Sequence, residues 1–220
     1  CWNGIRSVGS KTASGSESTG VIPFIKVVDA EMLAFSQGVT RRGSYAAYLD
    51  ISHPEIEEFL DVRKPTGGDI NRKSINLHHA IIIPDAFMEL IDKATREEGF
   101  NDDWDLVDPH SGEVKKTVSA KTLWVKLIQN RVETGEPYIM FGDAVNRKLP
   151  EFQKQLGLKV NQSNLCSEIT LPTNDDRTAV CCLSSVNLEK FDEWEKEDKF
   201  IPDLVRFLDN VLEHFINNAP

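Results

Sequence analysis

The strongest constraint on the fold is a regular alternation of short apolar runs with longer segments of helical periodicity. Four runs have the length and the β-branched or aromatic content of buried strands: Tyr45–Ile51, Ile75–Ile83, Tyr138–Phe141 and Ala179–Leu183. Helices are predicted to begin near Val21, His53-Pro54, Pro84-Asp85, Ala120 and Ile201, and a hairpin is predicted over Asp103–Lys116. Such alternation is typical of an α/β fold with mainly parallel strands.

No internal repeat and no break in composition divides the 220 residues, so the sequence predicts one domain or a piece of one. The chain begins with Cys1 rather than Met and stops at Pro220 directly after a helical segment. We therefore expect both ends to be cut, most simply by a partial gene model or a trimmed chain. The alternative is a gene interrupted by an insertion, with Cys1 the first residue after processing.

Charge and cysteine content exclude several classes of protein. The formal net charge of −10 argues against sequence-independent binding to a nucleic-acid backbone, which requires a basic surface. No stretch is long and apolar enough to cross a bilayer. The four cysteines form no Cys-x-x-Cys pair, whereas secreted disulfide-rich domains are smaller and richer in cysteine. We expect a cytoplasmic protein with no membrane or nucleic-acid partner.

Two polar loops flank the first predicted helix. Residues 7–20 are rich in Ser, Gly and Thr, which on composition and spacing favours a flexible linker. A small-residue loop that opens onto a helix can also cradle phosphate, because free N–H groups cluster there. The second loop, Ser36–Ser44, is bracketed by glycines and leads into the first predicted strand.

The long polar connection after Phe141 contains the residues that are the strongest candidates for a catalytic site. Loops of that length inside a compact α/β unit tend to be functional. If this segment is extended, Cys166 and Glu168 face the same way because they are two residues apart, and Asn164 lies beside them. A thiol, a carboxylate and an amide can form a catalytic site. From the residues alone, however, a buried cysteine is more often a small hydrophobic side chain.

Several blocks together resemble the large, catalytic (alpha) subunit of class I ribonucleotide reductases. The most specific are Gln162–Thr173, similar to the finger-loop motif of that family, and Cys181–Leu188, similar to the segment that follows it. The resemblance extends over nearly the whole chain, and its further blocks are Ser36-Gln37-Gly38 with Arg41, the Ala46–Asp50 strand, His53-Pro54, Asn76–Ala80 and Thr134–Ile139.

The resemblance implies a fold and a division of the chain. The family's catalytic domain is a ten-stranded α/β barrel made of two half-barrels, with the finger loop through its centre. Residues 1–160 then supply the first half-barrel with its effector loops, 161–175 the finger loop, and 176–220 the start of the second half-barrel. Neither half is closed by this chain, so we expect it to be inactive without the flanking parts of the large subunit.

The resemblance also implies catalytic roles. Cys166 is the cysteine whose thiyl radical abstracts the ribose 3′-hydrogen, Glu168 is the base at the 3′-hydroxyl, and Asn164 orients the ribose hydroxyls. Cys181 is one of two thiols that reduce the ribonucleotide to a deoxyribonucleotide and end as a disulfide. Neighbours on a strand face opposite ways, so Cys182 is expected to serve packing instead.

The same resemblance implies that the two polar loops respond to allosteric nucleotides. The loop with Gln37, Arg41 and Arg42 lies, in the family, between a specificity effector and the substrate base; Arg42 is alternatively a solvated charge. The loop with Ser10, Ser14 and Ser16 resembles the neighbouring effector loop, which reverses the preference for a linker. The effectors implied are ATP and deoxynucleoside triphosphates.

The expected partners follow from the family as well. This chain is expected to bind no cofactor, because the radical comes from a metal-containing small subunit. The side chains of adjacent histidines on a strand point in opposite directions, so we expect no metal site at His78-His79. The other partners implied are a ribonucleotide substrate, a second large subunit and a reductant of the thioredoxin or glutaredoxin type. Two alternatives are a class II reductase that uses adenosylcobalamin and a nucleotide-binding remnant without catalysis.

Overall fold

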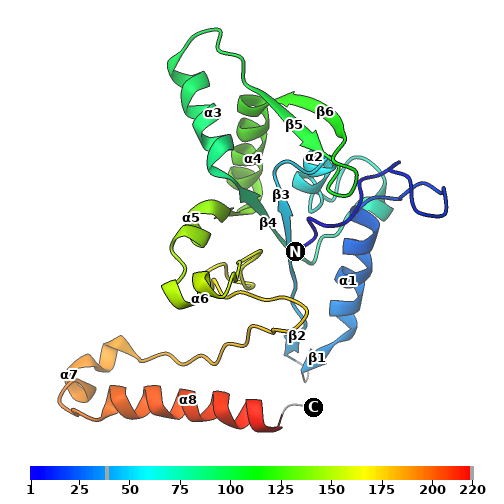
Figure 1. The fold of residues 1–220 in the computed structure, drawn as a ribbon. Coiled ribbons are helices and arrows are strands. Elements are labelled where there is room, and N and C mark those ends of the chain that lie inside the picture. The colour runs from blue at the N-terminus through cyan, green and yellow to red at the C-terminus, as the bar shows by residue number, and fades with distance from the viewer. Residues whose placement is uncertain (38–39, 219–220) are drawn as a thin grey trace. The chain divides into compact units, whose positions relative to one another are not determined.

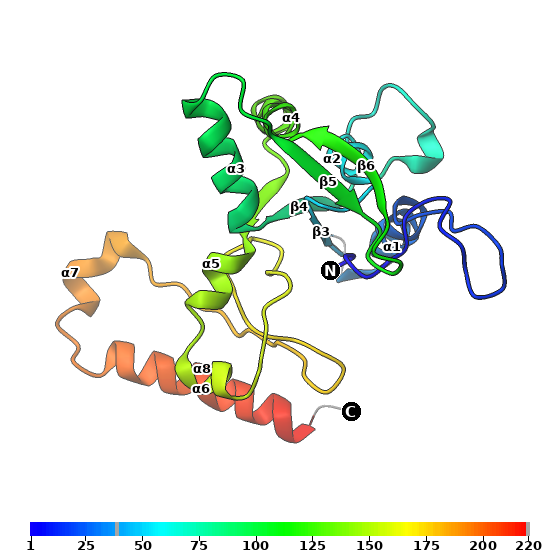
Figure 2. The same cartoon turned by 45° about the horizontal axis from the view of Figure 1, so that its top comes forward.

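The computed structural model describes residues 1–37 and 40–218; the side chains of Ser36, Gln37 and Arg41 are not described. The chain forms two compact units, Cys1–Pro172 and Thr173–Pro220, and each is described by itself. The first unit has the α/β character that the sequence predicts. Figures 1 and 2 show its helices and strands from two directions.

The first unit is built on a parallel sheet of three strands. Strands β3 (Ala46–Asp50), β4 (His78–Ile83) and β7 (Tyr138–Phe141) are ordered β3-β4-β7, and both neighbouring pairs are parallel. Parallel neighbours need crossover connections, which here contain the helices of the unit. The parallel strands were therefore correctly predicted from the alternation of apolar runs with helical segments.

The crossovers contain helices and one hairpin. Between β3 and β4 lie α2 (Ile56–Leu60) and the 3₁₀ turn η1 (Ile70–Arg72). Between β4 and β7 lie α3, the antiparallel pair β5–β6 and α4, with the bounds Asp85–Arg96, Asp103–Val107, Val114–Ser119 and Ala120–Thr134. Helices α3 and α4 lie side by side in both views (Figures 1 and 2).

Local signals explain the bounds of α4. The Ser119 hydroxyl accepts a hydrogen bond from Thr122 N at 3.1 Å and so caps the first turn. The helix ends at Gly135, whose φ of 79° is left-handed and is cheap only for glycine. Leu123 and Leu127 are buried in the main core, as their helical spacing predicts.

The sheet has two different faces. On one face, Ala47, Leu49, Ile81 and Ile83 belong to the main hydrophobic core with the helices. On the other face, the strand register sets Tyr48 beside Ala80 and Ala80 beside Tyr138. This row belongs to a smaller apolar cluster that includes Met140 and Val160. The second face supports the segment that contains Cys166.

The region around the first polar loops is also ordered. Helix α1 (Ile22–Ala34) starts where its periodicity predicts, with Pro23 in its first turn. It is followed by two short antiparallel strands, β1 (Ser36–Gln37) and β2 (Arg41–Arg42). Gly38 and Val39, part of the second predicted loop, lie outside the described residues.

The connection after β7 is not wholly irregular, because it contains α5 (Gly142–Arg147) and α6 (Glu151–Gln155). The second unit differs more from expectation. The strand predicted at Ala179–Leu183 is wrong: this segment has no regular structure. A β-strand needs a partner to satisfy its N–H and C=O groups, and none pairs with this run in the part of the chain described.

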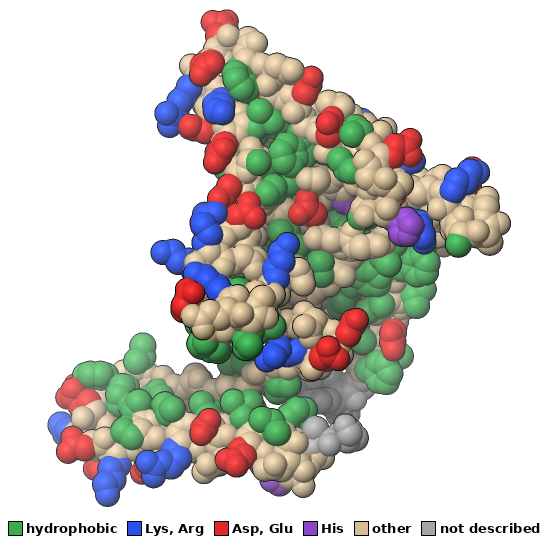
Figure 3. All heavy atoms as spheres, in the orientation of Figure 1, with side chains coloured by type: hydrophobic (Ala, Val, Ile, Leu, Met, Phe, Trp, Pro, Cys, Tyr) green, Lys and Arg blue, Asp and Glu red, His purple; other side chains and the backbone are tan. Residues whose placement is uncertain are grey.

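The second unit ends in an amphipathic helix. After the 3₁₀ turn η2 (Leu188–Lys190) and α7 (Phe191–Trp194), α8 runs from Phe200 to Asn218, close to the predicted helix. Figure 3 shows hydrophobic side chains gathered along α8; the exposed ones are Phe200, Ile201, Val205, Phe207, Val211, Phe215 and Ile216. Across the described residues, no helix combines the length and the apolar character that membrane crossing requires.

Candidate functional site

The segment that contains Cys166 is a tight turn, not an extended strand. Leu165 and Cys166 form the turn, and Ser167 N donates to Asn164 O at 3.2 Å. Ser167 has a φ of 68°, the left-handed region that side chains rarely adopt. The predicted extended geometry, in which Cys166 and Glu168 share a face, is therefore wrong. The turn forms because the main-chain carbonyl and the side chain of Asn164 accept hydrogen bonds from the N–H groups of residues 167–169.

Asn164 organises the turn through its side chain. Its Oδ1 accepts hydrogen bonds from Glu168 N and Ile169 N, both at 3.1 Å. Such Asn bonds to the main chain two or more residues on are typical of turns. The Nδ2 group of Asn164 keeps its capacity to donate to a ligand. Thus Asn164 positions the residues that directly follow Cys166.

Cys166 and Glu168 are both exposed, and Cys166 is a free thiol. The nearby Tyr138 hydroxyl has a raised pKa, because burial and the negative charges of Glu136 and Cys166 all disfavour its ionised form. The turn therefore presents a thiol and a carboxylate to solvent above a tyrosine of the sheet.

Tyr48 fastens this turn to the sheet. Its side chain is fully buried, yet its hydroxyl donates to Asn164 O at 2.9 Å and lies 3.2 Å from Ser167 Oγ. On the other side of the turn, the buried Ser163 hydroxyl donates to Ile169 O at 2.5 Å. Sequence reasoning missed both residues. The available signal was the polar hydroxyl of Tyr48 inside an otherwise apolar strand.

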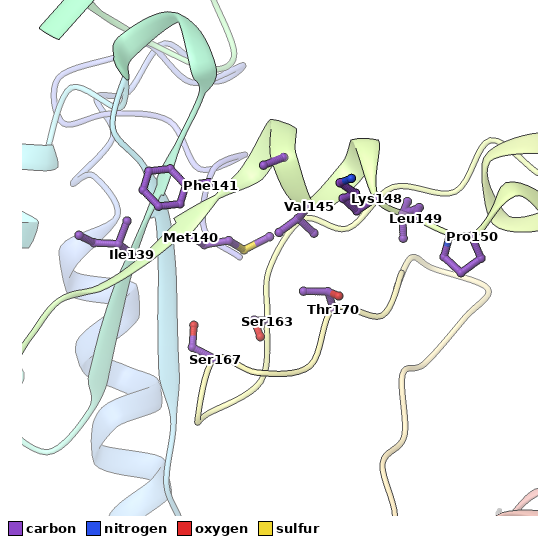
Figure 4. A pocket seen from close by; sticks show the side chains of 11 residues that line it. Ile139, Met140, Phe141, Val145, Lys148, Leu149, Pro150, Ser163, Ser167 and Thr170 are labelled. Atoms are coloured by element: carbon purple, nitrogen blue, oxygen red, sulfur yellow. The ribbon is translucent and has the colours of Figure 1, made fainter. Parts of the chain in front are cut away.

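A pocket of about 440 Å³ lies between this turn, β7 and α5. Figure 4 shows Ser163, Ser167 and Thr170 on the turn side, with Met140 and Val145 on the other. Its wall is mostly apolar with a few hydroxyls, which is the usual composition of a small-molecule site. Cys166 and Glu168 do not line the pocket; they stand on the segment that bounds it.

Cys181 and Cys182 belong to the second unit and are described there. Both are free thiols; Cys181 is exposed and Cys182 is partly buried. Because no strand forms here, opposite strand faces cannot explain the difference between them. The difference in exposure still distinguishes the two thiols, with Cys181 the more accessible.

The loop of residues 7–20, called the effector loop after the role expected for it, is ordered rather than a flexible linker. Its two arms are joined by hydrogen bonds from Gly9 N to Ser18 O at 2.9 Å and from Thr12 N to Ser16 O at 2.8 Å. Ser14 and Ser16 are exposed at the tip. Ser10, in contrast, is buried and donates its hydroxyl to Asp108 at 2.7 Å.

A buried carboxylate closes the base of the effector loop. Glu55 Oε2 accepts from Val8 N at 3.2 Å and from Val21 N at 2.9 Å, so it binds both ends of the loop. Arg72 balances its charge, with Nη2 to Oε1 at 3.1 Å. At the N-terminus of α1, which the sequence offered as a phosphate cradle, Glu55 thus accepts from the N–H group of Val21. A pocket of about 340 Å³, partly lined by Arg6 and Thr12, lies beside the loop.

The second predicted effector loop is described only in part. Gln37 pairs with Arg41, and Ser36 with Arg42, as neighbours on β1 and β2. The side chains of Gln37 and Arg41 lie outside what the structure describes. Arg42 is exposed, which is compatible with either of its predicted roles.

His78 and His79 contact one carboxylate. The Nδ1 atoms of His78 and His79 lie 2.5 and 3.0 Å from oxygens of the buried Glu136, and Arg63 Nη1 donates to it at 2.5 Å. Burial, the largest influence, lowers the pKa of His79. Within residues 1–37 and 40–218, no group of three or more His, Cys, Asp or Glu side chains could hold a metal ion.

Comparison with known proteins gives a consistent result. The family model of the ribonucleotide reductase barrel domain matches residues 1–220. A Frog virus 3 protein, named for a ribonucleoside-diphosphate reductase large subunit, is 51% identical over 219 residues, covering 100% of this chain and 36% of the viral protein. The corresponding large subunit of Invertebrate iridescent virus 3 is 45% identical over 251 residues, covering 93% of this chain and 40% of its own length.

A solved structure agrees with these relatives. The alpha subunit of the class Id ribonucleotide reductase of Actinobacillus ureae matches with a TM-score of 0.74 and 32% identity. The match covers 99% of this chain and 35% of that subunit. The chain therefore spans between 35% and 40% of the length of these three proteins.

Proposed function

The chain belongs to the ribonucleotide reductase barrel-domain family, and from this we propose that it supplies the finger-loop part of a ribonucleoside-diphosphate reductase large subunit. The complete enzyme reduces ribonucleotides to deoxyribonucleotides for DNA synthesis. The observation that carries the proposal is the turn at Asn164–Ile169, which presents a free thiol and a carboxylate and is fastened to the sheet by Tyr48. A reaction that uses a thiol and a carboxylate together needs this kind of fixed presentation.

We assign the hydrogen-atom transfer to Cys166. As a thiyl radical it takes the 3′-hydrogen atom of the ribose, which forms the S–H bond and leaves a carbon radical at C3′. Glu168 accepts the proton of the 3′-hydroxyl, and the 2′-hydroxyl leaves as water after one of the two reducing thiols protonates it. Asn164 Nδ2 donates to the ribose hydroxyls while its Oδ1 holds the turn. The radical itself comes from a metal-containing small subunit.

We assign the reducing step to Cys181. Two thiols each give up one proton and one electron and join as a disulfide. One proton leaves in the water formed from the 2′-hydroxyl, and the other proton with both electrons reduces the ribose. The ribose then recovers its 3′-hydrogen atom from Cys166, which returns to the thiyl radical. The second thiol belongs to a flanking part of the large subunit. A reductant of the thioredoxin or glutaredoxin type then restores both thiols by disulfide exchange. The exposure of Cys181 supports this assignment over Cys182.

We assign regulation to the two polar loops. Ser14 and Ser16 at the exposed tip of the effector loop, together with Gln37, Arg41 and Arg42, bind ATP or a deoxynucleoside triphosphate. Ser10 belongs to this loop as an anchor, because its hydroxyl is held by Asp108. A second large subunit completes the assembly, which we place in the cytoplasm.

The first test is nucleotide reduction by a large subunit that contains this chain, mixed with its small subunit. Reduction of a ribonucleoside diphosphate is expected with the wild type and not with Cys166→Ser. Cys182→Ser is the matched control, since it removes a thiol of the same chain outside the proposed chemistry. Turnover that requires adenosylcobalamin and no small subunit would instead indicate a class II enzyme. Nucleotide binding without any turnover would indicate a non-catalytic remnant.

A further inference from the structure

Asp108 lies in the turn between β5 and β6 and is fully buried, yet it reaches the effector loop about a hundred residues earlier in the chain. Its Oδ2 accepts three hydrogen bonds from that loop. The donors are Ser7 N at 2.8 Å, Ser7 Oγ at 2.7 Å and Ser10 Oγ at 2.7 Å. One oxygen atom thus fixes the first residues of the effector loop to the β5–β6 hairpin.

The other oxygen of Asp108 holds its own turn. Oδ1 accepts from His110 N at 3.0 Å, from Ser111 N at 2.9 Å and from Ser111 Oγ at 3.1 Å. A second contact lies beside this bridge, because Nη2 of Arg6, the residue directly before the loop, lies 2.7 Å from His110 Nε2. The carboxylate therefore bridges the β5–β6 turn and the effector loop.

The bridge depends on the charged carboxylate. Burial by itself would raise the pKa of Asp108, but hydrogen bonds from Ser10 and Ser7 hold that pKa well below its usual range. A carboxylate can accept at both oxygens, whereas the amide of asparagine accepts at one and presents N–H donors at the other. Each oxygen of Asp108 accepts from three donors. In Asp108→Asn, the three donors at one of these positions would therefore face the N–H groups of the amide.

The anchored residues are coupled to the exposed tip. Ser18 N donates to Ser10 O at 2.9 Å, and Gly9 N donates to Ser18 O at 2.9 Å, so the second arm of the loop is aligned on Ser10. Ser14 and Ser16 lie between these arms. A displacement of Ser10 must therefore displace the tip.

We propose that Asp108 is a positioning residue for the effector loop: it couples the β5–β6 turn to the loop and thereby sets nucleotide affinity and the choice of substrate. This inference rests on the proposed function of the loop. Asp108 is not assigned contact with the nucleotide, because its oxygens are occupied by the protein. This role could not be read from the sequence, because Asp108 and its partners Ser7 and Ser10 are about a hundred residues apart.

The test compares the wild type, Asp108→Asn and Asp105→Asn in the complete large subunit with its small subunit. Asp105 is exposed on the same hairpin, and among the described residues it accepts only from Thr117 Oγ1, at 2.6 Å. Affinity for dTTP is measured by equilibrium binding, and hydrogen exchange is followed in residues 8–18. The ratio of the reduction rates of two ribonucleotides at saturating dTTP is also recorded. Simple loss of folded enzyme lowers both rates together and leaves that ratio unchanged.

Asp108→Asn is expected to weaken dTTP binding by about tenfold or more, to speed exchange in the effector loop and to change the rate ratio. Asp105→Asn should resemble the wild type. Wild-type dTTP affinity and rate ratio in Asp108→Asn would overturn the inference. A wild-type enzyme that reduces nucleotides with no response to dTTP would overturn it and leave the catalytic proposal standing. Weaker dTTP binding in the variant, in an enzyme without turnover, would support the inference and overturn the catalytic proposal.

Discussion

The hydroxyl of Tyr48 donates a 2.9 Å hydrogen bond to the main-chain carbonyl of Asn164, across 116 positions of sequence. Tyr48 is a fully buried strand residue, and Asn164 starts the exposed turn that contains Cys166. The bond connects a residue of the sheet to a solvent-exposed loop, and loops are in general more mobile than the strands they connect. It fixes the position of Cys166 without contacting that residue.

Tyr48→Phe is therefore expected to lower the rate of nucleotide reduction more than it lowers stability. The change removes one hydroxyl, leaves the buried ring in place and costs about 1 kcal/mol in stability. Loss of the fixed turn is expected to reduce kcat by about tenfold or more. The measurement is steady-state reduction together with thermal unfolding. Tyr45→Phe is the control, because the Tyr45 hydroxyl contacts Trp2 instead of the turn. Equal kcat values for the two variants would refute the positioning role.

Much of the first unit was predictable because its signals are local. The spacing of Leu123 and Leu127 identifies α4 as a helix, and the cap at Ser119 and the stop at Gly135 define its two ends. Strand β7 was predicted with its observed bounds, Tyr138–Phe141. Apolar periodicity and capping act between neighbours in the chain, so a single sequence contains them.

The site was less predictable because its geometry depends on remote contacts. The left-handed Ser167 is compatible with the fold because Tyr48 and Asn164 hold the turn around it. Likewise, the position of Ser10 in the loop of residues 7–20 is plain from the sequence, but its bond to Asp108 spans 98 residues. At Ala179–Leu183 the composition favours a strand, and only a pairing partner could have made it one.

Cys181 and Cys182 offer a sharp test of the redox assignment. Cys181→Ser is expected to abolish multiple turnover with a thioredoxin-type reductant, because one of the two reducing thiols is lost. Cys182→Ser should reduce nucleotides at a rate near that of the wild type. Both variants change one sulfur to oxygen at neighbouring positions, so each controls for the other. If Cys182→Ser is the inactive variant, the reducing thiol has been assigned to the wrong residue.

Gly20→Ala tests the closure of the effector loop by Glu55. Gly20 has a φ of 85°, and a Cβ there would stand 2.2 Å from Glu55 Oε1. The carboxylate must move, which breaks its bonds to Val8 N and Val21 N, so we expect a loss of about 2 kcal/mol or more in stability. Gly15→Ala is the matched control: φ is 80° but nothing lies within 4 Å of a Cβ, so only the backbone cost of about 1 kcal/mol applies. Similar unfolding midpoints for the two variants would show that the Glu55 side chain can move away without a loss of stability.

Glu136 should make the fold sensitive to acid. Burial opposes its ionisation, but hydrogen bonds from His79 and His78 and the charge of Arg63 lower its pKa from 4.5 to about 2. The folded pKa is below the unfolded one, so the stabilisation is complete above about pH 4.5 and is lost as the pH falls towards 2. Glu136→Gln cannot titrate there. Its stability deficit relative to the wild type, measured by denaturant unfolding, is therefore expected to shrink as the pH is lowered from 5 to 3.

Glu133→Gln provides the comparison for that series. Glu133 is exposed, 60% in its side chain, and pairs only with Lys64 at 3.3 Å among the described residues. An exposed pair of this kind contributes little, so this variant should follow the wild type at every pH. A deficit of Glu136→Gln that stays constant from pH 5 to 3 would mean that the carboxylate keeps an ordinary pKa in the fold. The two histidines and Arg63 would then be held by packing rather than by its charge.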